Sequence, residues 1–551
     1  MSAGGRRPIA KKSREPSTKV SSKTARGTRE LARRAKVAER RTARRQVAGR
    51  RAVARGHATL SLISVSRRAL ARIPAAARVC ALLAFLNAAC WSVITPPFLA
   101  LDEPDHFAYV QQLAEAGRLP SSSVSEYSPE EQLALQDLHH EQVRFRPAGH
   151  PIFSTAEQQK LQADLAKSPS RQGPGGAGVA ASEPPLYYAL ETIPYGIGSS
   201  GSILDRLELM RLLSAVMGGL TALFVFLFLR EALPGVRWAW TVGGLGAALA
   251  PLLGFASSTV NPDALLFTVS AALFYCFARA FRRGLTQASA ITIGTLIAVG
   301  LLTKLNFAGL APGAILGLIV LARREARTSG SETYYRMLAP ALLIAVSPGI
   351  LYGLVNVFSN HPTFGIVSNG LEGLTGSHGS ISGELSYIWQ FYLPRLPGMH
   401  NYFSGIFTTR QIWFRNLIGL YGWGDTAFPA WVYNVALIPV GIIAALCIRT
   451  LTVSRTALRP RAPELATYAV MTVGLLVLIG ASGYLSFPGS AVEFTDARYL
   501  LPMVALWGAV LALAARGAGR RWGPAVGALL VVLVLAHDIF SQLQVVARYY
   551  G

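Results

Sequence analysis

Long apolar runs without charged residues dominate the chain from Val79 onwards. Their residues are clumped, and they do not follow the period of an amphipathic helix or strand. Runs of about 18 or more such residues can cross a hydrocarbon core roughly 30 Å thick. The first run ends in Pro96 and Pro97. Ten more are centred near Leu220, Leu245, Phe267, Ile297, Ile315, Ile344, Ile438, Leu475, Val504 and Leu530. The pattern predicts an all-α polytopic membrane protein with about 11 transmembrane helices.

Polar stretches between the runs divide the chain into six predicted segments. These are a basic, disordered cytoplasmic tail (1–72), the first transmembrane helix (79–100), a large, partly helical extracytoplasmic loop (101–205), transmembrane helices 2–7 (206–357), a second extracytoplasmic loop (358–427) and transmembrane helices 8–11 (428–541). Residues 370–383 are rich in Gly and Ser and predict a mobile loop that closes over a substrate. No internal repeat is visible, which counts against transporter folds built from symmetric halves.

The distribution of Arg and Lys predicts the orientation in the membrane. Basic residues gather in alternate connections, near 230–237, 279–283, 323–327, 449–461 and 516–521, and the short connections between them are poor in Lys and Arg. Short loops enriched in these residues stay on the cytoplasmic side. The N-terminus is therefore predicted to be cytoplasmic, and the Ala- and Arg-rich composition points to a bacterial plasma membrane. The motifs discussed below then fall on the extracytoplasmic side.

Most of the net charge belongs to the N-terminal tail. Residues 1–57 contain 19 Lys and Arg against three Glu, a net charge of +16 out of +24 for the whole chain. The tail has almost no large apolar side chains, so it cannot bury enough surface to fold. We expect it to lie on anionic lipid, and we expect no nucleic-acid partner, because a membrane span follows directly. It lacks the layout of a cleavable signal peptide.

The cysteines and the missing motifs exclude several kinds of chemistry. Cys80, Cys90, Cys276 and Cys447 lie in or beside apolar runs without zinc-site or CxxC spacing, so we expect them to be packing residues. The sequence has no Walker A lysine motif, no GxGxxG between strand and helix and no HExxH. ATP-driven transport and soluble nucleotide-sugar chemistry therefore lose support. No cofactor is predicted apart from a divalent metal, which stays an open alternative.

The sharpest candidate for chemistry is an acidic cluster directly after the first span. Asp102, Glu103, Asp105 and His106 lie within five residues of one another. A carboxylate near lipid and near a like charge can have a raised pKa and act as a general base. Asp102, Glu103 and His106 could instead bind a divalent metal. The structural alternative is that Asp102 caps a helix whose first turn carries Glu103 and Asp105.

The order D-E-x-x-H-F after a first transmembrane helix, in a large external loop, resembles the acidic motif of GT-C glycosyltransferases. Protein O-mannosyltransferases and lipid A aminoarabinose transferases are examples. The resemblance implies a GT-C-like helical bundle in which Asp102 is the catalytic base for an acceptor hydroxyl, with Glu103 beside it. This chain has one residue more than the mannosyltransferase spacing, which keeps Asp105 as a rival for the same role.

A second element, S-E-P-P-L-Y-Y (182–188), resembles the [HQE]-P-P-L-Y-Y element near the end of the same loop in those transferases. The resemblance makes Tyr187 and Tyr188 candidate substrate-binding residues. The structural alternative is a polyproline turn that places aromatic rings at the membrane interface.

Three further motifs make the resemblance more specific: N-P-D-A-L (261–265), W-Q-F-Y-L-P-R-L-P (389–397) and R-Y-L-L-P (498–502). With the acidic motif, they resemble a bacterial membrane family, the domain of unknown function 2142, over about residues 79–502. In the first of these motifs, Asp263 is predicted to cap the span that follows.

Lys304, Arg395 and Arg498 are candidate donor-binding residues. A cation at the end of a span is costly unless it meets an anion or reaches the interface. A polyprenyl-phosphate sugar presents its phosphate at that depth, and a guanidinium suits phosphate geometry. The alternatives are that Lys304 extends to the interface and that Arg498 pairs with Asp496 or Glu493.

These observations predict a GT-C-type glycosyltransferase that moves a sugar from a polyprenyl-phosphate donor to an extracytoplasmic glycan, lipid or protein acceptor. A basic side chain would stabilise the charge on the leaving phosphate, and single displacement would invert the anomeric carbon. One alternative is a transporter or flippase of lipid-linked saccharides, which needs polar residues across the whole membrane. The other is a non-catalytic cell-envelope assembly protein in which the acidic motif is only a cap.

Overall fold

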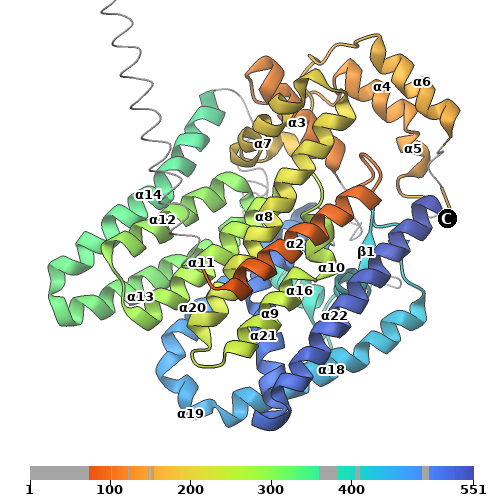
Figure 1. Ribbon diagram of the computed structural model, residues 1–551. Helices are drawn as coiled ribbons and strands as arrows, with labels where there is room; N and C mark the ends of the chain where they lie inside the picture. The colour runs from red at the N-terminus through yellow and green to blue at the C-terminus, as the bar shows by residue number, and fades with distance from the viewer. Residues whose placement is uncertain are drawn as a thin grey trace, which may run out of the picture. The chain divides into compact units, whose positions relative to one another are not determined.

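The structure is a computed structural model that describes residues 73–100, 102–121, 123–146, 148–149, 154–358, 381–403, 410–486 and 496–551 (Figure 1). Residues 75–551 form one compact unit, which contains every element described below. The predicted basic tail (1–72), Glu493 and almost all of the predicted mobile stretch 370–383 lie outside the described residues.

Within the described residues, eight helices are long and apolar enough to cross a membrane. They are α2 (Ala75–Ile94), α8 (Ile203–Ala232), α11 (Asp263–Arg283), α14 (Ser331–Phe358), α18 (Ala430–Val453), α19 with α20 (Arg455–Leu458 and Ala462–Ser486), η6 with α21 (Ala497–Met503 and Val504–Gly517) and α22 (Gly519–Tyr550). Almost no sheet accompanies them in this part of the chain. The predicted all-α polytopic membrane class is confirmed.

Three of the predicted spans fall on helices outside this set, so the predicted number of 11 is not confirmed. The helix α9 (Arg237–Ala248) ends before α10 (Pro251–Ala256), because Ala250 precedes a proline and is extended. The helix α12 (Gln287–Thr303) ends at the extended residue Lys304. The helix α13 (Ala311–Ser329) is charged in its last turns and follows the 3-10 turn η3 (Leu305–Gly309).

The chain between α2 and α8 is largely helical, as predicted for the first loop. It contains α3 (Glu103–Ala116), α4 (Pro129–Asp137), α5 (His140–Val143), α6 (Thr155–Ala166) and α7 (Leu186–Ile197), with the 3-10 turns η1 (Gly178–Ser182) and η2 (Gly198–Ser200). We call residues 102–202 the loop domain. Its helices, orange to gold in Figure 1, lie together beyond the same end of α2 and α8. Serine hydroxyls cap α4, α6 and α8 in the manner typical of helix N-termini.

The second predicted loop is also partly structured. It contains α16 (Ile381–Tyr392), a π-helical turn (Arg410–Arg415), α17 (Asn416–Gly419) and a short antiparallel pair, β1 (Leu420–Tyr421) and β2 (Thr426–Ala427). Leu420 pairs with Ala427, and Tyr421 pairs with Thr426.

The long helices pack through apolar side chains and close backbone contacts. The helix α8 packs against α2, α9 and α11, and the largest apolar core contains Phe267, Phe274 and Phe277 of α11. Where α9 crosses α21, a Cβ on Gly243 would overlap the carbonyl oxygen of Gly508. Glycine therefore lets these two backbones touch, as is common between membrane helices. The packing holds the ends of α2, α11, α12 and α21 in fixed positions, and these ends carry the charged residues discussed next.

Candidate active site

Six charged side chains from five separate segments meet in one group. They are Asp102, Glu183, Asp263, Lys304, Asp496 and Arg498. We call this group the charged cluster. Each member lies next to a helix end: before α3, before α7, at the start of α11, at the end of α12 and at the start of η6. Because α2 leads directly into α3, the cluster lies on the side of the molecule where α2 ends.

Arg498 is the centre of the cluster. Its Nη2 donates a hydrogen bond of 2.8 Å to Asp102 Oδ2. Its Nε lies 3.0 Å from Asp496 Oδ2 and 3.5 Å from Asp263 Oδ2. Within the described residues Nε has no partner with hydrogen-bond geometry, although the side chain is only 9% exposed. The pairing with Asp496 was one of the alternatives that the sequence left open, whereas the contacts with Asp102 and Asp263 were not predicted.

Asp263 connects Arg498 to Lys304. The Lys304 Nζ lies 2.9 Å from Asp263 Oδ1 and 4.0 Å from Glu183 Oε1. Lys304 is buried and paired, so it does not extend to the interface in the way that the sequence left open. The predicted capping role of Asp263 is also wrong, because the side-chain oxygen that accepts the backbone N–H there is that of Asn261. The Asp263 carboxylate is free to bind the two cations.

Asp102 has the backbone and the exposure of an accessible group. It adopts a left-handed conformation with φ of 61°, a conformation that Asp tolerates better than most residues. It precedes α3, as expected for a cap, but its side chain makes no capping hydrogen bond. Its side chain is 24% exposed, whereas Asp263 is 1% exposed. A molecule that reaches the cluster therefore meets Asp102 before Asp263.

Glu103 serves a different purpose from its neighbour Asp102. Its carboxylate is completely buried against Arg211, with distances of 2.8 Å from Nε and 2.6 Å from Nη2. It also accepts the backbone N–H groups of Phe98 and Val260, each at 3.1 Å. Four donors thus occupy one buried carboxylate, and they join the exit of α2 to α3, α8 and the segment before α11. This arrangement makes Glu103 a structural anchor.

Asp105 points into the loop domain. The hydroxyl of Tyr127 donates to Asp105 Oδ1 at 2.5 Å, and the backbone N–H of Val179 donates to Oδ2 at 3.2 Å. Burial raises the pKa of Asp105, and the Tyr127 hydrogen bond opposes that rise. A Cβ on Gly178 would overlap this carboxylate, so the chain closes tightly over it. The geometry separates Asp105 from its rival Asp102, whose partner is Arg498.

His106, Tyr187 and Tyr188 form an aromatic support behind the cluster. The His106 Nδ1 lies 2.9 Å from the Tyr188 hydroxyl, and the ring of Tyr188 stacks on Tyr109 with centroids 3.7 Å apart. Burial lowers the pKa of His106, and the charges of Lys304 and Arg498 lower it further, so the imidazole is neutral. Tyr187 is buried and contacts the Ser214 hydroxyl. All three side chains are almost inaccessible to a substrate.

Arg395 lies elsewhere in the described structure. It follows α16, its side chain is exposed, and its Nη1 donates to the backbone oxygen of Met399 at 3.4 Å. No contact among the described residues joins it to the charged cluster. Of the three candidate cations, Lys304 and Arg498 therefore share one site and Arg395 does not.

The charge balance of the cluster is negative. Four carboxylates face two cations, so the group carries a surplus of negative charge when all members are ionised. Burial raises the pKa of Glu183, and the charge of Lys304 lowers it, so a proton on Glu183 would reduce the surplus. Among the described residues, no group of three or more His, Cys, Asp or Glu has the arrangement of a metal site. The trio Asp102, Glu103 and His106 that the sequence suggested for a metal diverges to three different partners.

Sequence reasoning missed Glu183 as a member of the site, favoured a capping role for Asp263 over a catalytic one, and gave Asp496 only as an alternative partner of Arg498. Each of them lies in a motif that the sequence did single out: E-P-P-L-Y-Y, N-P-D and the segment before R-Y-L-L-P. Tyr499 was also missed, although its ring lies 5.7 Å from Lys304 Nζ and 5.5 Å from the Arg498 guanidinium carbon. A cation beside an aromatic ring is favoured by the ring's quadrupole.

The chain belongs to the family described as Predicted membrane protein (DUF2142), which it matches over residues 85–507. The predicted membership of this family is confirmed. No curated protein matches the chain in sequence.

Three solved structures are similar to this fold at low sequence identity. ArnT from Cupriavidus metallidurans, bound to undecaprenyl phosphate, is 15% identical with a TM-score of 0.41, over 85% of this chain and 75% of that one. The Archaeoglobus fulgidus oligosaccharyltransferase in the apo form is 13% identical with a TM-score of 0.41, over 86% of this chain and 56% of that one. The oligosaccharyltransferase AglB from the same archaeon, in complex with an inhibitory peptide and a dolichol-phosphate, is 14% identical with a TM-score of 0.43 and the same coverage.

This chain thus spans just over half of the length of the archaeal proteins. Scores of this size correspond to a loose similarity of fold, which places neither a substrate nor a catalytic residue in this chain.

Proposed function

We propose that this DUF2142 protein is a glycosyltransferase that moves a sugar from a polyprenyl-phosphate donor to an acceptor hydroxyl at the extracytoplasmic face. The observation that carries the proposal is the Asp102–Arg498 pair, whose side chains lie 2.8 Å apart and in which Asp102 is 24% exposed. One carboxylate that is free of capping duties and one buried guanidinium supply the two functions that the reaction needs. These are removal of a proton and stabilisation of a leaving anion.

The proposed reaction is a single displacement at the anomeric carbon of the donor sugar. The acceptor oxygen loses its proton to Asp102 and forms a bond to the anomeric carbon. The bond between that carbon and the donor phosphate oxygen breaks, and its electron pair remains on the phosphate. Arg498, with Lys304 deeper in the cluster, stabilises that charge. A single displacement of this kind inverts the anomeric carbon.

Because carboxylates outnumber cations in the charged cluster, the donor phosphate has to compete with them for Arg498. A phosphate that reaches Arg498 has to replace one of its carboxylate partners, and the side chains of Asp102 (24% exposed) and Asp496 (26% exposed) are more accessible than that of Asp263 (1% exposed). If Asp102 is the partner replaced, its carboxylate loses the hydrogen bond from Arg498 and can accept one from the acceptor hydroxyl instead. Donor binding would thereby prepare the base for the acceptor.

The proposal is tested with the purified full-length protein in lipid nanodiscs. Radiolabelled polyprenyl-phosphate sugars are supplied with a panel of glycan, lipid and peptide acceptors, each with Mg²⁺, with Mn²⁺ and with EDTA. Asp102→Asn should lower transfer by about 10²–10⁴-fold, the usual contribution of a general base. Asp164→Asn makes the same chemical change at a partly exposed residue of α6, away from the charged cluster, and should leave transfer unchanged.

Full activity of Asp102→Asn would rule out its role as the base, and loss only in Asp105→Asn would transfer the role to Asp105. Saturable donor binding without transfer or hydrolysis, in the wild type and in Asp102→Asn alike, would favour a transporter or an assembly protein. The unfolding temperature of every variant shows whether a loss of activity reflects misfolding.

A further inference from the structure

A second polar region lies in the loop domain, away from the charged cluster. It is a cavity of about 740 Å³ between α6, residues 168–172 and the start of α8. This volume falls within the range of small-molecule sites, about 300–1,000 Å³. The side chains that line it include Glu115, Gln158, Gln162, Ala166 and Arg171.

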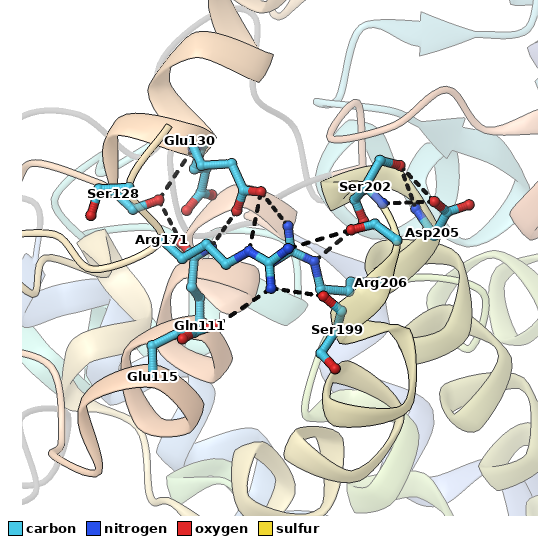
Figure 2. A network of polar contacts seen from close by, with 12 residues as sticks. Gln111, Glu115, Ser128, Glu130, Arg171, Ser199, Ser202, Asp205 and Arg206 are labelled. Atoms are coloured by element: carbon cyan, nitrogen blue, oxygen red, sulfur yellow. Dashed lines mark hydrogen bonds and ion pairs between the residues drawn. The ribbon is translucent and has the colours of Figure 1, made fainter. Parts of the chain in front are cut away.

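Figure 2 shows a network of polar contacts around Glu130, whose side chain lines this cavity. Arg206 is completely buried, and its Nη2 binds Glu130 Oε1 while its Nη1 donates to the Tyr195 hydroxyl at 2.7 Å. Gln111 donates to the other oxygen of Glu130 at 2.9 Å, and the Ser128 hydroxyl donates to Gln111 at 2.6 Å. These partners hold the Glu130 carboxylate in place, so the wall is formed before any ligand arrives.

The charged side chains around the cavity leave no surplus charge. Arg171 donates to the backbone oxygens of Ser199 and Gly201, at 2.9 Å and 3.5 Å, and lies 3.6 Å from Glu130 and 4.0 Å from Glu115. With Arg206, the region contains two guanidinium groups and two carboxylates, all of them paired. An anionic ligand such as a phosphate would gain little here, because each guanidinium is already balanced by a carboxylate. A neutral ligand with many hydroxyl groups fits this balance.

The helix α6 presents hydrogen-bonding groups that its own chain does not use. Gln158 and Gln162 are four residues apart on one face, are exposed, and have no side-chain hydrogen bond within the described residues. Each amide offers donors and an acceptor to a hydroxyl group. Leu161 and Leu165 lie between and beside them and add an apolar surface to the same cavity. Alternating amides and small apolar patches suit the hydroxyl groups and C–H faces of a sugar ring.

The helix α3 links this cavity to the charged cluster. Asp102 immediately precedes its first residue, and Glu115, in its last turn, lines the cavity. A helix of 14 residues is about 20 Å long at 1.5 Å per residue. A ligand that touches both ends must therefore be an extended chain, longer than one sugar ring.

We infer that this cavity binds a segment of a neutral oligosaccharide. If the protein is the glycosyltransferase proposed here, that segment belongs to the acceptor, and its growing end reaches Asp102. The binding itself does not depend on that function.

The inference is tested by calorimetric titration of the full-length protein in nanodiscs with maltoheptaose, cellohexaose, mannohexaose and galactohexaose. Hexagalacturonate and a Ser/Gly decapeptide are the anionic and peptide comparisons. Ala166→Trp fills the cavity, and Ala163→Trp places the same ring on α6 outside the lining. At least one neutral glycan should bind saturably, and Ala166→Trp should weaken its binding by about tenfold or more, whereas Ala163→Trp should not.

A second pair of variants tests the amides without adding bulk. The double variant Gln158→Ala with Gln162→Ala should bind the same glycan with lower affinity than the wild type. Gln159→Ala should leave that affinity unchanged. The inference is overturned if none of the neutral glycans binds, if only hexagalacturonate or the decapeptide binds, or if the lining and control variants behave alike.

The two proposals fail separately in these experiments. Glycan binding with no transfer from any donor would overturn the proposed function and leave the cavity assignment intact. Sugar transfer without glycan binding in the cavity would overturn the cavity assignment and leave the proposed function intact. Asp102→Asn should retain the glycan affinity of the wild type, because Asp102 lies at the other end of α3.

Discussion

Arg211 and Arg498 are both buried arginines that bind residues of the same acidic motif, and they differ in how completely their partners match them. Arg211 meets Glu103 through Nε and Nη2, and its remaining donors reach Glu208 and the backbone oxygens of Ser92, Thr95 and Pro96. Arg498 meets its carboxylate partners at distances from 2.8 to 3.5 Å, and its Nε has no hydrogen bond of good geometry within the described residues.

The difference distinguishes an anchor from a candidate site. A buried guanidinium with all of its donors matched is costly to disturb and offers nothing to a ligand. A guanidinium with imperfectly matched donors and partly exposed carboxylates can exchange a partner for a substrate anion. The two arginines lie on different helices, yet they hold consecutive residues, Glu103 and Asp102, so one short motif contains both functions.

The largest expected effect is on stability at Arg211. Arg211→Lys keeps the positive charge but has only three donors, so at least two buried acceptors lose a hydrogen bond at about 1–3 kcal/mol each. The variant should unfold at a much lower temperature than the wild type, or fail to accumulate. Size-exclusion chromatography after heating to a series of temperatures measures the unfolding temperature. The matched control is Arg144→Lys, at a partly exposed ion pair with Glu141. A wild-type unfolding temperature would contradict the anchor role.

The same change at Arg498 should affect activity more than stability. Lysine cannot hold a carboxylate and a phosphate in the planar fork of a guanidinium, and loss of one preorganised donor costs about 10²–10³-fold in kcat. The unfolding temperature should fall less than in Arg211→Lys. Transfer kinetics measured beside thermal unfolding separate the two effects. Equal loss of stability at both positions would show that Arg498 is a second anchor.

Substitution of Lys304 should have a smaller effect, confined to the affinity for the donor. Lys304→Met removes one of the two cations that would face the phosphate, so the KM for the donor should rise by about tenfold. Lys304→Arg restores the charge and should recover most of that affinity. If Lys304→Met changes neither KM nor kcat, or if Lys304→Arg is no better than Lys304→Met, Lys304 only neutralises Asp263.

Glu131 shows what happens to a buried carboxyl without an arginine of its own. It is completely buried, and within the described residues neither of its oxygens has a hydrogen-bond partner. Burial raises its pKa well above the ordinary value, and the nearby charges of Asp105 and Glu130 add to the rise. The folded protein therefore keeps a proton that the unfolded chain releases, so stability falls as pH rises above the unfolded pKa.

Glu131→Gln cannot ionise, so it should lose less stability than the wild type between about pH 5 and about pH 8. The unfolding temperature across this range measures the effect, and Glu157→Gln on α6 is the partly exposed control. Parallel curves for the wild type and Glu131→Gln would show that the carboxyl does not titrate in this window.

Prediction from sequence worked where local composition is sufficient. An uncharged run such as residues 212–229 inside α8 has no stable solution outside a membrane or a very large core, so the helical membrane class was determined by the chain alone. The number of spans was not, because α9 ends before Pro251, α12 ends at Lys304, and α13 is long enough but carries four charged residues in its last turns. The sequence singled out the segments that carry the site and offered Asp496 as a partner of Arg498, but Glu183 and Asp263 were not recognised as partners of the cations.

The sequence by itself determined that acidic residues follow the first span and that basic residues lie at the ends of later spans. Only the tertiary structure decided which of them meet. Asp102, Glu103 and Asp105 have similar side chains, but at a helix start successive residues point about 100° apart, and small shifts in chain position select different partners. Glu103 reaches Arg211, Asp105 reaches Tyr127, and Asp102 reaches Arg498, which is 396 residues away along the chain. Contacts over that distance depend on how the helices pack, and no local pattern in the sequence encodes them.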